Sequence, residues 1–249
     1  MVGEPCDVVQ GLGGAARRVI LSADASDLWP NDIGRGSSPG VSLGGKERNY
    51  LPTRMPMIPT FTDTVILPSQ LPRIAWLNGA GYTRQIATDT AGGSKSSPDY
   101  RWRLSLADLT QPAAFSLLSG IDRVFTLASD GPITMTSDRG SCTLRLGQTI
   151  EFEGEAPMAF EGSTGEPQLG LNLMTRRGIC AGSVAVMRLA GQMLLDPAAG
   201  VVAATVLHGI GALSSGQRLD SLATLVLDAE AVALESEGCL VAITTVQEP

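Results

Sequence analysis

The sequence predicts an all-β protein made of two small barrels or jelly rolls in tandem. From about residue 60 onward, short segments alternate apolar and polar residues, and Gly, Pro, Asp or Ser turns separate them at intervals of roughly 8–12 residues. Helical periodicity is weak, apart from turns expected around residues 117–121. More than ten such segments in about 190 residues are too many for one simple sandwich, which favours two barrels.

Each alternating segment defines the two faces of an expected strand. The segment WRLSLADL puts Trp102, Leu104 and Leu106 on one face, and Arg103 and Ser105 on the other. The same alternation, or a continuous apolar run of strand length, occurs in FTDTVILP, PITMTS, SCTLRLG, TIEFEGE, QLGLNLMT, GSVAVMRLAG, GVVAATVLHG, ATLVLDAE and CLVAITTV. Aromatic residues make up only 4% of the chain, so we expect a core of mostly Leu, Val, Ala and Ile.

The stretch WLNGAGYTRQIA contains a tight turn between two strands. Asn78-Gly79 is a strong turn signal, because both residue types accept a positive φ. We expect this turn to set Thr83 and Arg84 at the rim or in the interior of the first barrel. There the planar fork of the arginine would clamp a small carboxylate. The alternative for Arg84 is an ordinary solvated charge on a strand edge.

Residues 1–56 differ from the rest of the chain. They contain GLGG, GRGSSPG, SLGG and several prolines, a composition that fits a flexible, low-complexity extension better than a packed domain. Met55 and Met57 stand directly before the first convincing strand. We therefore expect the biological start at one of these methionines rather than at Met1, with the upstream stretch a tail or a mis-called coding sequence.

The composition argues against several classes of partner. The formal charge is −7 and the pI is near 4.7, which disfavours nucleic acid and anionic membranes. No apolar run approaches the roughly 18 residues of a membrane span, and the N-terminus lacks the order of a signal peptide. The four cysteines are scattered without a CxxC pair, so no disulfide framework or zinc knuckle is expected. We expect a soluble cytoplasmic protein.

Four features resemble chemical motifs but lack the context that the chemistry needs. GVSLG at 40–44 matches G-x-S-x-G, but no strand precedes it and no helix follows. GLGG at 11–14 lacks the GK[ST] of a phosphate loop. His208 is the only histidine, and Glu151 and Glu153 share an outward strand face. A metalloenzyme is therefore disfavoured, and no cofactor is expected.

Five motifs resemble those of the HutD/Ves family and occur in the same order: WLNGAGYTR, WRLS, FSLLSGIDR, FEGE and LNLMTRRG. The resemblance covers roughly residues 65–249. It implies a bicupin, in which two double-stranded β-helix (jelly-roll) barrels pack together. It also implies an association with histidine utilisation. The implied role is to bind a pathway metabolite, urocanate or formylglutamate, and to limit pathway activity rather than to catalyse a step.

This reading divides the chain into three parts. Residues 1–56 form the extension, residues 57–160 form the first barrel with the ligand site, and residues 161–249 form the second barrel. The second half has few polar residues of the kind that hold a carboxylate, so we expect it to be structural support.

The candidate ligand-binding residues are polar side chains on expected interior faces. If the Trp102 face packs between the barrels, Arg103 and Ser105 point into a cavity; otherwise they lie on the surface. Arg123 either forms an ion pair with the neighbouring aspartate or contacts the ligand. Asn172 either braces a loop or reads a ligand, because a buried amide must satisfy both its groups. The full candidate set is Asn78, Thr83, Arg84, Arg103, Ser105, Arg123 and Asn172.

The leading hypothesis is a metal-free bicupin that binds a small carboxylate and modulates histidine catabolism. A cupin barrel has room for one small ligand, and the His-rich metal site typical of cupin enzymes cannot be built from a single histidine. One alternative is a metal-independent isomerase or lyase, whose general acid or base is a carboxylate, Tyr82 or His208. Another is a structural or interaction module whose barrels are filled by side chains. Homodimer formation is left open.

Overall fold

The computed structural model describes residues 64–76, 78–90, 100–162 and 167–248. Within these ranges the regular structure consists of strands and two short 3-10 helices, η1 (Pro68–Gln70) and η2 (Pro197–Ala199). The prediction of an all-β chain is thereby confirmed. The expected extension over residues 1–56, with its alternative start at Met55 or Met57, lies outside the described residues.

Ten strands form two sheets that pack face to face, and we call them the N-terminal sheet pair. The six-stranded sheet has the order β2 (Ile74–Ala75), β3 (Gly81–Thr90), β4 (Tyr100–Leu109), β11 (Gln168–Arg176), β6 (Ile121–Leu127) and β9 (Thr149–Glu153). The four-stranded sheet has the order β5 (Ala113–Ala114), β10 (Ala159–Gly162), β7 (Ile133–Ser137) and β8 (Gly140–Leu144). All of their pairings are antiparallel.

An apolar core lies between these two sheets. Phe125 and Leu127 of the six-stranded sheet pack with Met135 and Phe160 of the four-stranded sheet, and all four are essentially inaccessible to solvent. Gly170 permits this packing, because a Cβ there would lie 2.2 Å from the Phe125 ring. A larger residue at position 170 would push the ring out of the core.

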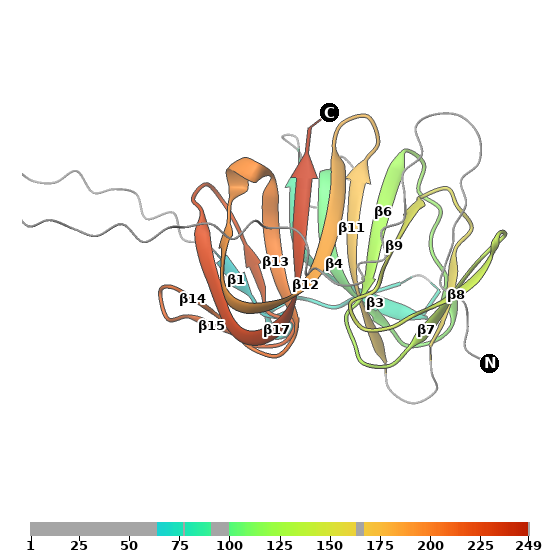
Figure 1. Cartoon of the computed structure of the whole chain (residues 1–249). Coiled ribbons are helices and arrows are strands. Elements are labelled where there is room, and N and C mark those ends of the chain that lie inside the picture. Colours follow the sequence, from blue (N-terminus) through green and yellow to red (C-terminus); the bar gives the residue numbers. More distant parts are fainter. Residues whose placement is uncertain (1–63, 77, 91–99, 163–166, 249) are drawn as a thin grey trace, which may run out of the picture.

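The remaining seven strands form the C-terminal sheet. Its order is β1 (Thr64–Ile66), β16 (Thr224–Val226), β13 (Val201–His208), β17 (Val232–Gln247), β14 (Gly211–Leu213) and β15 (Arg218–Leu219), and β12 (Ala181–Leu195) pairs with β17. The two long strands, β12 and β17, bend where their register shifts between Leu189 and Ala190. Gly191 and Gly238 flank this irregularity with positive φ values of 108° and 146°, which side chains rarely tolerate. Figure 1 shows the sheet curling over itself.

The two halves of the molecule lie side by side, with β11 next to β12 (Figure 1). Leu104 and Leu171 of the six-stranded sheet pack against Ala203, Leu207 and Ala242 of the C-terminal sheet. Each central strand of the six-stranded sheet therefore has one face against the C-terminal sheet and the other toward the four-stranded sheet.

The strand pairing moves the predicted boundary at residue 160. β11 inserts between β4 and β6, so the N-terminal sheet pair continues to Arg176 instead of ending at residue 160. Conversely, β1 precedes the N-terminal sheet pair in sequence but belongs to the C-terminal sheet, where it pairs with β16. Sequence order alone cannot show that either segment crosses to the other half.

The part of the chain that the structure describes contains no helix long and apolar enough to cross a membrane.

Candidate ligand-binding site

The candidate site is built on three neighbouring strands of the six-stranded sheet. Met174 on β11 is paired with Arg103 on β4 at one side and with Arg123 on β6 at the other. Paired residues of adjacent strands point to the same face. The two arginines, which we call the arginine pair, therefore flank Met174 on the face that looks toward the four-stranded sheet.

The arginine pair lacks charged partners in the described ranges. Arg123 is 3% exposed, and the Nε atoms of both arginines are buried without a hydrogen-bond partner. Arg103 donates to the Met174 sulfur at 3.6 Å, and Arg123 donates to the backbone oxygen of Ser116. A thioether and a carbonyl are neutral acceptors, so neither positive charge has a carboxylate partner among the residues that the structure describes.

Aromatic rings surround the arginine pair. The Arg103 guanidinium lies 5.3 Å from the centroid of the Tyr100 ring, and that of Arg123 lies 5.6 Å from Phe115 and 5.7 Å from Phe152. The negative faces of aromatic rings attract cations, although more weakly than a carboxylate does. These contacts orient the guanidinium groups and leave the Nε donors without a partner among the described residues.

The electrostatics of Arg123 reflect this environment. Burial lowers the pKa of Arg123 from its usual value, Tyr100 acts in the opposite direction, and the positive charge of Arg103 lowers the pKa further. Arg123 is buried and Arg103 is partly exposed, and the two like charges repel each other at a cost in free energy. An anion bound between them would remove this cost.

Ser105 and Asn172 lie on the same face as Arg103 and Met174, two residues away along β4 and β11. They are opposite each other on β4 and β11, and they are 1% and 6% exposed. The Ser105 hydroxyl donates to the backbone oxygen of Asn172 at 3.4 Å, whereas the side-chain Oδ1 of Asn172 is buried and has no partner. Trp102 packs in the interface between the two halves, so Arg103 and Ser105 on the other face of β4 point toward the four-stranded sheet.

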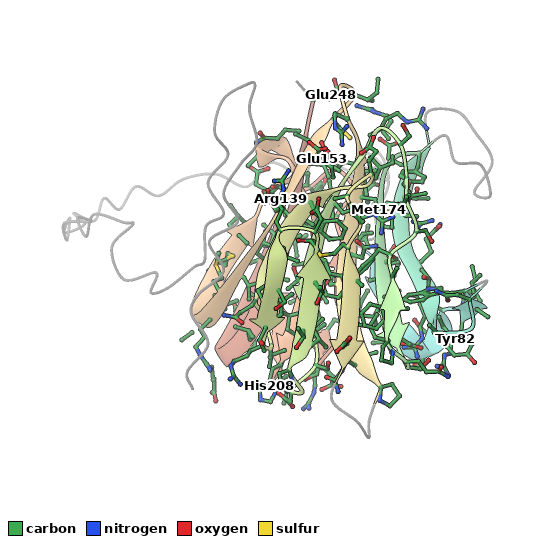
Figure 2. The ribbon with its side chains drawn as sticks, turned by 90° about the vertical axis from the view of Figure 1, so that its right-hand side faces the viewer. Tyr82, Arg139, Glu153, Met174, His208 and Glu248 are labelled. Carbon is green, nitrogen blue, oxygen red and sulfur yellow. The ribbon has the colours of Figure 1, made fainter. Side chains whose placement is uncertain are left out.

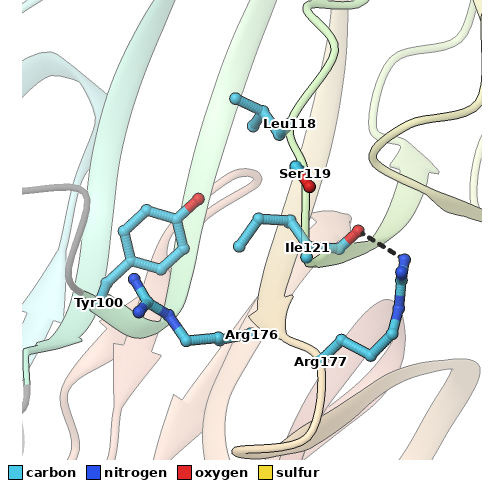
Figure 3. A pocket seen from close by; sticks show the side chains of 7 residues that line it. Tyr100, Leu118, Ser119, Ile121, Arg176 and Arg177 are labelled. Atoms are coloured by element: carbon cyan, nitrogen blue, oxygen red, sulfur yellow. Dashed lines mark hydrogen bonds between the residues drawn. The ribbon is translucent and has the colours of Figure 1, made fainter.

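A hollow of about 340 Å³ opens beside Tyr100, at the end where β11 finishes (Figure 3). Neither Arg103 nor Arg123 lines it. Tyr100 lines the hollow and also contacts the arginine pair: its ring faces Arg103, and its hydroxyl donates to the Met174 sulfur at 3.4 Å. Figure 2 shows Met174 toward the end that carries Glu153 and Glu248, away from Tyr82 and His208. The residues that line the hollow are Tyr100, Leu118, Ser119, Gly120, Ile121, Arg176 and Arg177.

Ion pairs hold one wall of this hollow. Arg177 contacts Asp122 at 2.8 Å and Glu155 at 3.0 Å, and it donates to the backbone oxygen of Ile121. Glu155 also accepts from the backbone N–H of Gly120 at 2.7 Å. The Gly120 hydrogen bond, followed by that from Arg177, lowers the pKa of Glu155 to about 2. Conversely, Asp122 and Glu155 raise the pKa of Arg177. Asp122 thus pairs with Arg177 and not with Arg123.

Asn78 and Thr83 lie away from the arginine pair. The Asn78-Gly79 turn forms as predicted, with Asn78 Oδ1 accepting from the Ala80 N–H at 3.1 Å and Gly79 at φ 70°. Thr83 accepts from the Trp76 indole at 2.8 Å and is paired with Ala107, further along the sheet from Arg103. Both residues fix the local structure at the opposite end of the strands.

Arg84 lies on the opposite face of β3 from Thr83, because successive residues of a strand alternate. It is paired with Leu106, and its guanidinium contacts Asp108 at 2.9 Å. Arg73 contacts the same carboxylate oxygen at 2.8 Å and stacks on the Tyr82 ring. The structure therefore does not bring Arg84 to Arg103, and its charge is already compensated by a protein carboxylate.

The other polar candidates do not converge on the arginine pair. His208 is exposed at the end of β13 in the C-terminal sheet. Among the described residues, no three His, Cys, Asp or Glu side chains lie close enough together to hold a metal ion. The interior contacts that sequence reasoning missed are Tyr100 and Met174.

Fold and site together define an all-β protein with two arginines on an interior face of one sheet and a hollow near the end of that face. The chain belongs to the HutD family, whose family model matches residues 68–242. The predicted resemblance to HutD/Ves proteins is confirmed.

Relatives at the sequence level are named Protein Ves. That of Cronobacter sakazakii is 36% identical over 127 residues, which are 51% of this chain and 65% of the relative. That of Citrobacter koseri is 33% identical over 118 residues, which are 47% of this chain and 60% of the relative. The matches thus span less than two thirds of the length of these relatives.

Solved structures share the fold at low sequence identity. HutD from Pseudomonas fluorescens SBW25 (formate condition) has a TM-score of 0.63 and 21% identity, covering 76% of this chain and 100% of that chain. A conserved protein of unknown function from Pseudomonas aeruginosa PAO1 has a TM-score of 0.62 and 22% identity, covering 74% and 98%. Both are similar to this chain in fold.

Proposed function

We propose that this protein is a metal-free bicupin that binds a small carboxylate between the sheets of the N-terminal sheet pair and thereby modulates histidine catabolism. The observation that carries the proposal is the arginine pair. Within the described ranges, Arg103 and Arg123 share one interior face, donate to neutral acceptors, and each have a buried Nε without a partner. A carboxylate would satisfy both guanidinium groups.

The energetics favour such a ligand. A guanidinium binds a carboxylate through parallel N–H···O bonds, and each charge-assisted bond contributes about 1.5–3 kcal/mol. Relief of the repulsion between Arg103 and Arg123 adds to this gain. Two such contacts and a packed ligand body give roughly micromolar affinity after the cost of immobilising the ligand. That range suits a protein that senses a metabolite.

Membership of the HutD family supports urocanate and formylglutamate as the candidate ligands. Both carry a carboxylate and are small enough for a hollow of about 340 Å³. Tyr100 lies between the hollow and the arginine pair, where its ring offers a surface for the body of the ligand.

The bicupin architecture is the finer part of the proposal. Two separate apolar cores support it, one inside the N-terminal sheet pair and one inside the curled C-terminal sheet. A third core, between the two halves, contains Leu104, Leu171 and Ala242. Each half thus encloses its own interior, as a barrel does, and shares only an outer face.

The proposal assigns no catalytic step to this site. Tyr82 stacks under Arg73 and follows the Asn78-Gly79 turn, and His208 lies in the C-terminal sheet. Neither of these proton donors is placed at the arginine pair. Steady turnover of urocanate or formylglutamate would instead support the isomerase or lyase alternative.

Isothermal titration of the full chain with urocanate, formylglutamate, histidine and glutamate tests the proposal. We expect saturable micromolar binding of urocanate or formylglutamate that is lost in Arg123→Gln and in Arg103→Gln. Arg188→Gln is the matched control, because Arg188 is an exposed arginine on β12 of the C-terminal sheet. Equal heats for Arg123→Gln and the wild-type protein would refute the site, and no heat from any of the four compounds would refute the ligand class.

A further inference from the structure

The free edges of the three sheets differ greatly in length. In the part of the chain that the structure describes, six of the seven edge strands have two to five residues, and these are β1, β2, β5, β8, β9 and β15. The seventh, β12, has 15 residues and pairs on one side only, with β17, among the described strands. Short edge strands are one way in which proteins avoid unwanted pairing, whereas a long open edge is a template for another strand.

β12 also lacks two common protections of an edge strand. Its sequence, AGSVAVMRLAGQMLL, contains no proline and one charged residue, Arg188. In the second half of the strand, Ala190, Gly191 and Gln192 are exposed, and Leu194 is 66% exposed. This half therefore presents backbone hydrogen-bonding groups that have no partner in the described ranges, next to an uncovered apolar side chain.

The two faces of β12 follow from strand alternation. Leu189 and Leu195 are buried in the apolar cluster of the C-terminal sheet, and Met193 packs against it. The side chains on the opposite, outward face are those of Arg188, Ala190, Gln192 and Leu194. Residues that are directly opposite in an antiparallel pair point to the same face, so a strand added at this edge would place its own outward residues beside these four.

We infer that the strand added at this edge is β12 of a second copy of this chain, paired antiparallel across a two-fold axis at Ala190. Two identical strands can pair in this way because each offers the same surface to the other. Overlap over the full length would put Arg188 directly opposite the partner's Arg188, and like charges in such a pair destabilise a sheet. An axis at Ala190 avoids this contact and puts Leu194 opposite the partner's Val186, so two apolar side chains cover each other.

Charge complementarity supports this register. With the axis at Ala190, Gln192 is opposite the partner's Arg188. The Gln192 amide donates to the Glu235 carboxylate of β17 at 2.6 Å, which holds this carboxylate beside the outward face of β12. Two strand spacings, about 10 Å, separate the backbone of Glu235 from that of the partner's Arg188, and the two side chains together span this distance. The symmetry forms this ion pair twice, and Arg188 has no carboxylate partner among the described residues of its own chain.

This dimer is independent of the proposed function. β12 belongs to the C-terminal sheet, whereas Arg103 and Arg123 lie on β4 and β6 of the other half. Each copy offers one long edge and uses it once, so pairing closes at two copies. The expected assembly therefore has twice the 25.9 kDa mass of the chain.

Analytical ultracentrifugation of the full chain over a concentration series tests the inference. We expect a monomer–dimer equilibrium for the wild-type protein. Ala190→Lys places two lysines opposite each other at the axis, so it should raise the dissociation constant of the dimer by about tenfold or more. Thr143→Lys is the matched control, because it puts the same charge at an exposed position of the short edge strand β8 and should leave the dissociation constant unchanged. Thermal unfolding checks that both variants are folded.

A charge exchange tests the register. Arg188→Glu and Glu235→Arg each bring like charges together across the interface, and each should weaken the dimer by about tenfold or more. The double variant restores opposite charges and should recover most of the wild-type affinity. Within one chain, Arg188 lies four residues, or about 13 Å, along β12 from Gln192, which is paired with Glu235, so the recovery can come only from contacts between copies.

Several outcomes would overturn the inference. A monomer at every concentration would do so, as would a wild-type dissociation constant for folded Ala190→Lys. An assembly of more than two copies would also overturn it, since that assembly needs a second surface. Failure of the double variant to recover affinity would overturn the register at Ala190. If Ala190→Lys does not fold, the charge exchange alone decides the matter.

Discussion

The two halves of this molecule use the same kind of antiparallel sheet for different purposes. The C-terminal sheet encloses an apolar cluster that includes Leu219, Leu225 and Val241. The N-terminal sheet pair has an apolar core in its lower layers and then a polar face with Arg103, Arg123 and Asn172. In the proposed function, the first interior serves stability and the second uses its unpaired Nε donors to hold a ligand.

Core truncation in the C-terminal sheet should have the largest effect on stability. Leu225 is completely buried, and Leu225→Ala should lower the free energy of unfolding by about 2–5 kcal/mol through lost burial and a residual cavity. Chemical denaturation measures this change. The dissociation constant of the ligand should stay within about twofold of the wild-type value, and a large loss of affinity in this folded variant would contradict the separation of roles.

Removal of the buried charge of Arg123 should instead lower ligand affinity strongly and change the free energy of unfolding little. Arg123→Met keeps most of the side-chain volume and removes a guanidinium that has no carboxylate partner in the described ranges. We expect affinity to fall about 100-fold, which corresponds to roughly 3 kcal/mol. The free energy of unfolding should not decrease by more than about 1 kcal/mol, because an unpaired buried charge is itself destabilising. Parallel titration and denaturation check both quantities.

Retention of the charge without the fork gives a smaller effect. Arg103→Lys keeps one positive charge beside Tyr100 and Met174 but replaces the planar guanidinium by a point charge. We expect a loss of affinity of about tenfold, which is less than for Arg103→Gln. If Arg103→Lys binds as tightly as the wild-type protein, the arginine acts only through its charge.

The pH dependence of the wall of the hollow gives the smallest predicted effect. The pKa of Glu155 is lowered from 4.5 to about 2, first by the Gly120 N–H and then by Arg177. Its contribution to stability is therefore present above pH 4.5 and is lost as the pH falls toward 2. Thermal midpoints of the wild-type protein and Glu155→Gln should differ at pH 7 and converge toward pH 2. A difference that is constant with pH would show that the carboxylate charge does not matter.

Strand alternation was enough to predict part of the site. The pattern in WRLSLADL placed Arg103 and Ser105 opposite Trp102, and the spacing of Leu171 and Leu173 placed Asn172 on the other face, as the register confirms. These residues lie on central strands with one apolar face packed against the C-terminal sheet. Because side chains alternate along a strand, the apolar residues also show which residues lie on the opposite face.

Other features depended on contacts that no local pattern contains. Thr83 and Arg84 were both predicted to lie at the rim or in the interior of the first barrel, but neighbours on a strand point to opposite faces, and Arg84 contacts Asp108 of the next strand. Tyr100 and Trp102 are two residues apart, so alternation alone predicts that both point away from Arg103. The Tyr100 ring nevertheless contacts Arg103, next to a register shift between β3 and β4. The position of β11 between β4 and β6 is likewise a long-range property of the sheet.

A crystal structure of the full chain with bound N-formyl-L-glutamate or urocanate tests the central claim most directly. We predict electron density for a carboxylate between the guanidinium groups of Arg103 and Arg123, with the body of the ligand directed toward Tyr100. Density beside Arg73 and Arg84, or inside the C-terminal sheet, with the arginine pair unchanged, would contradict it.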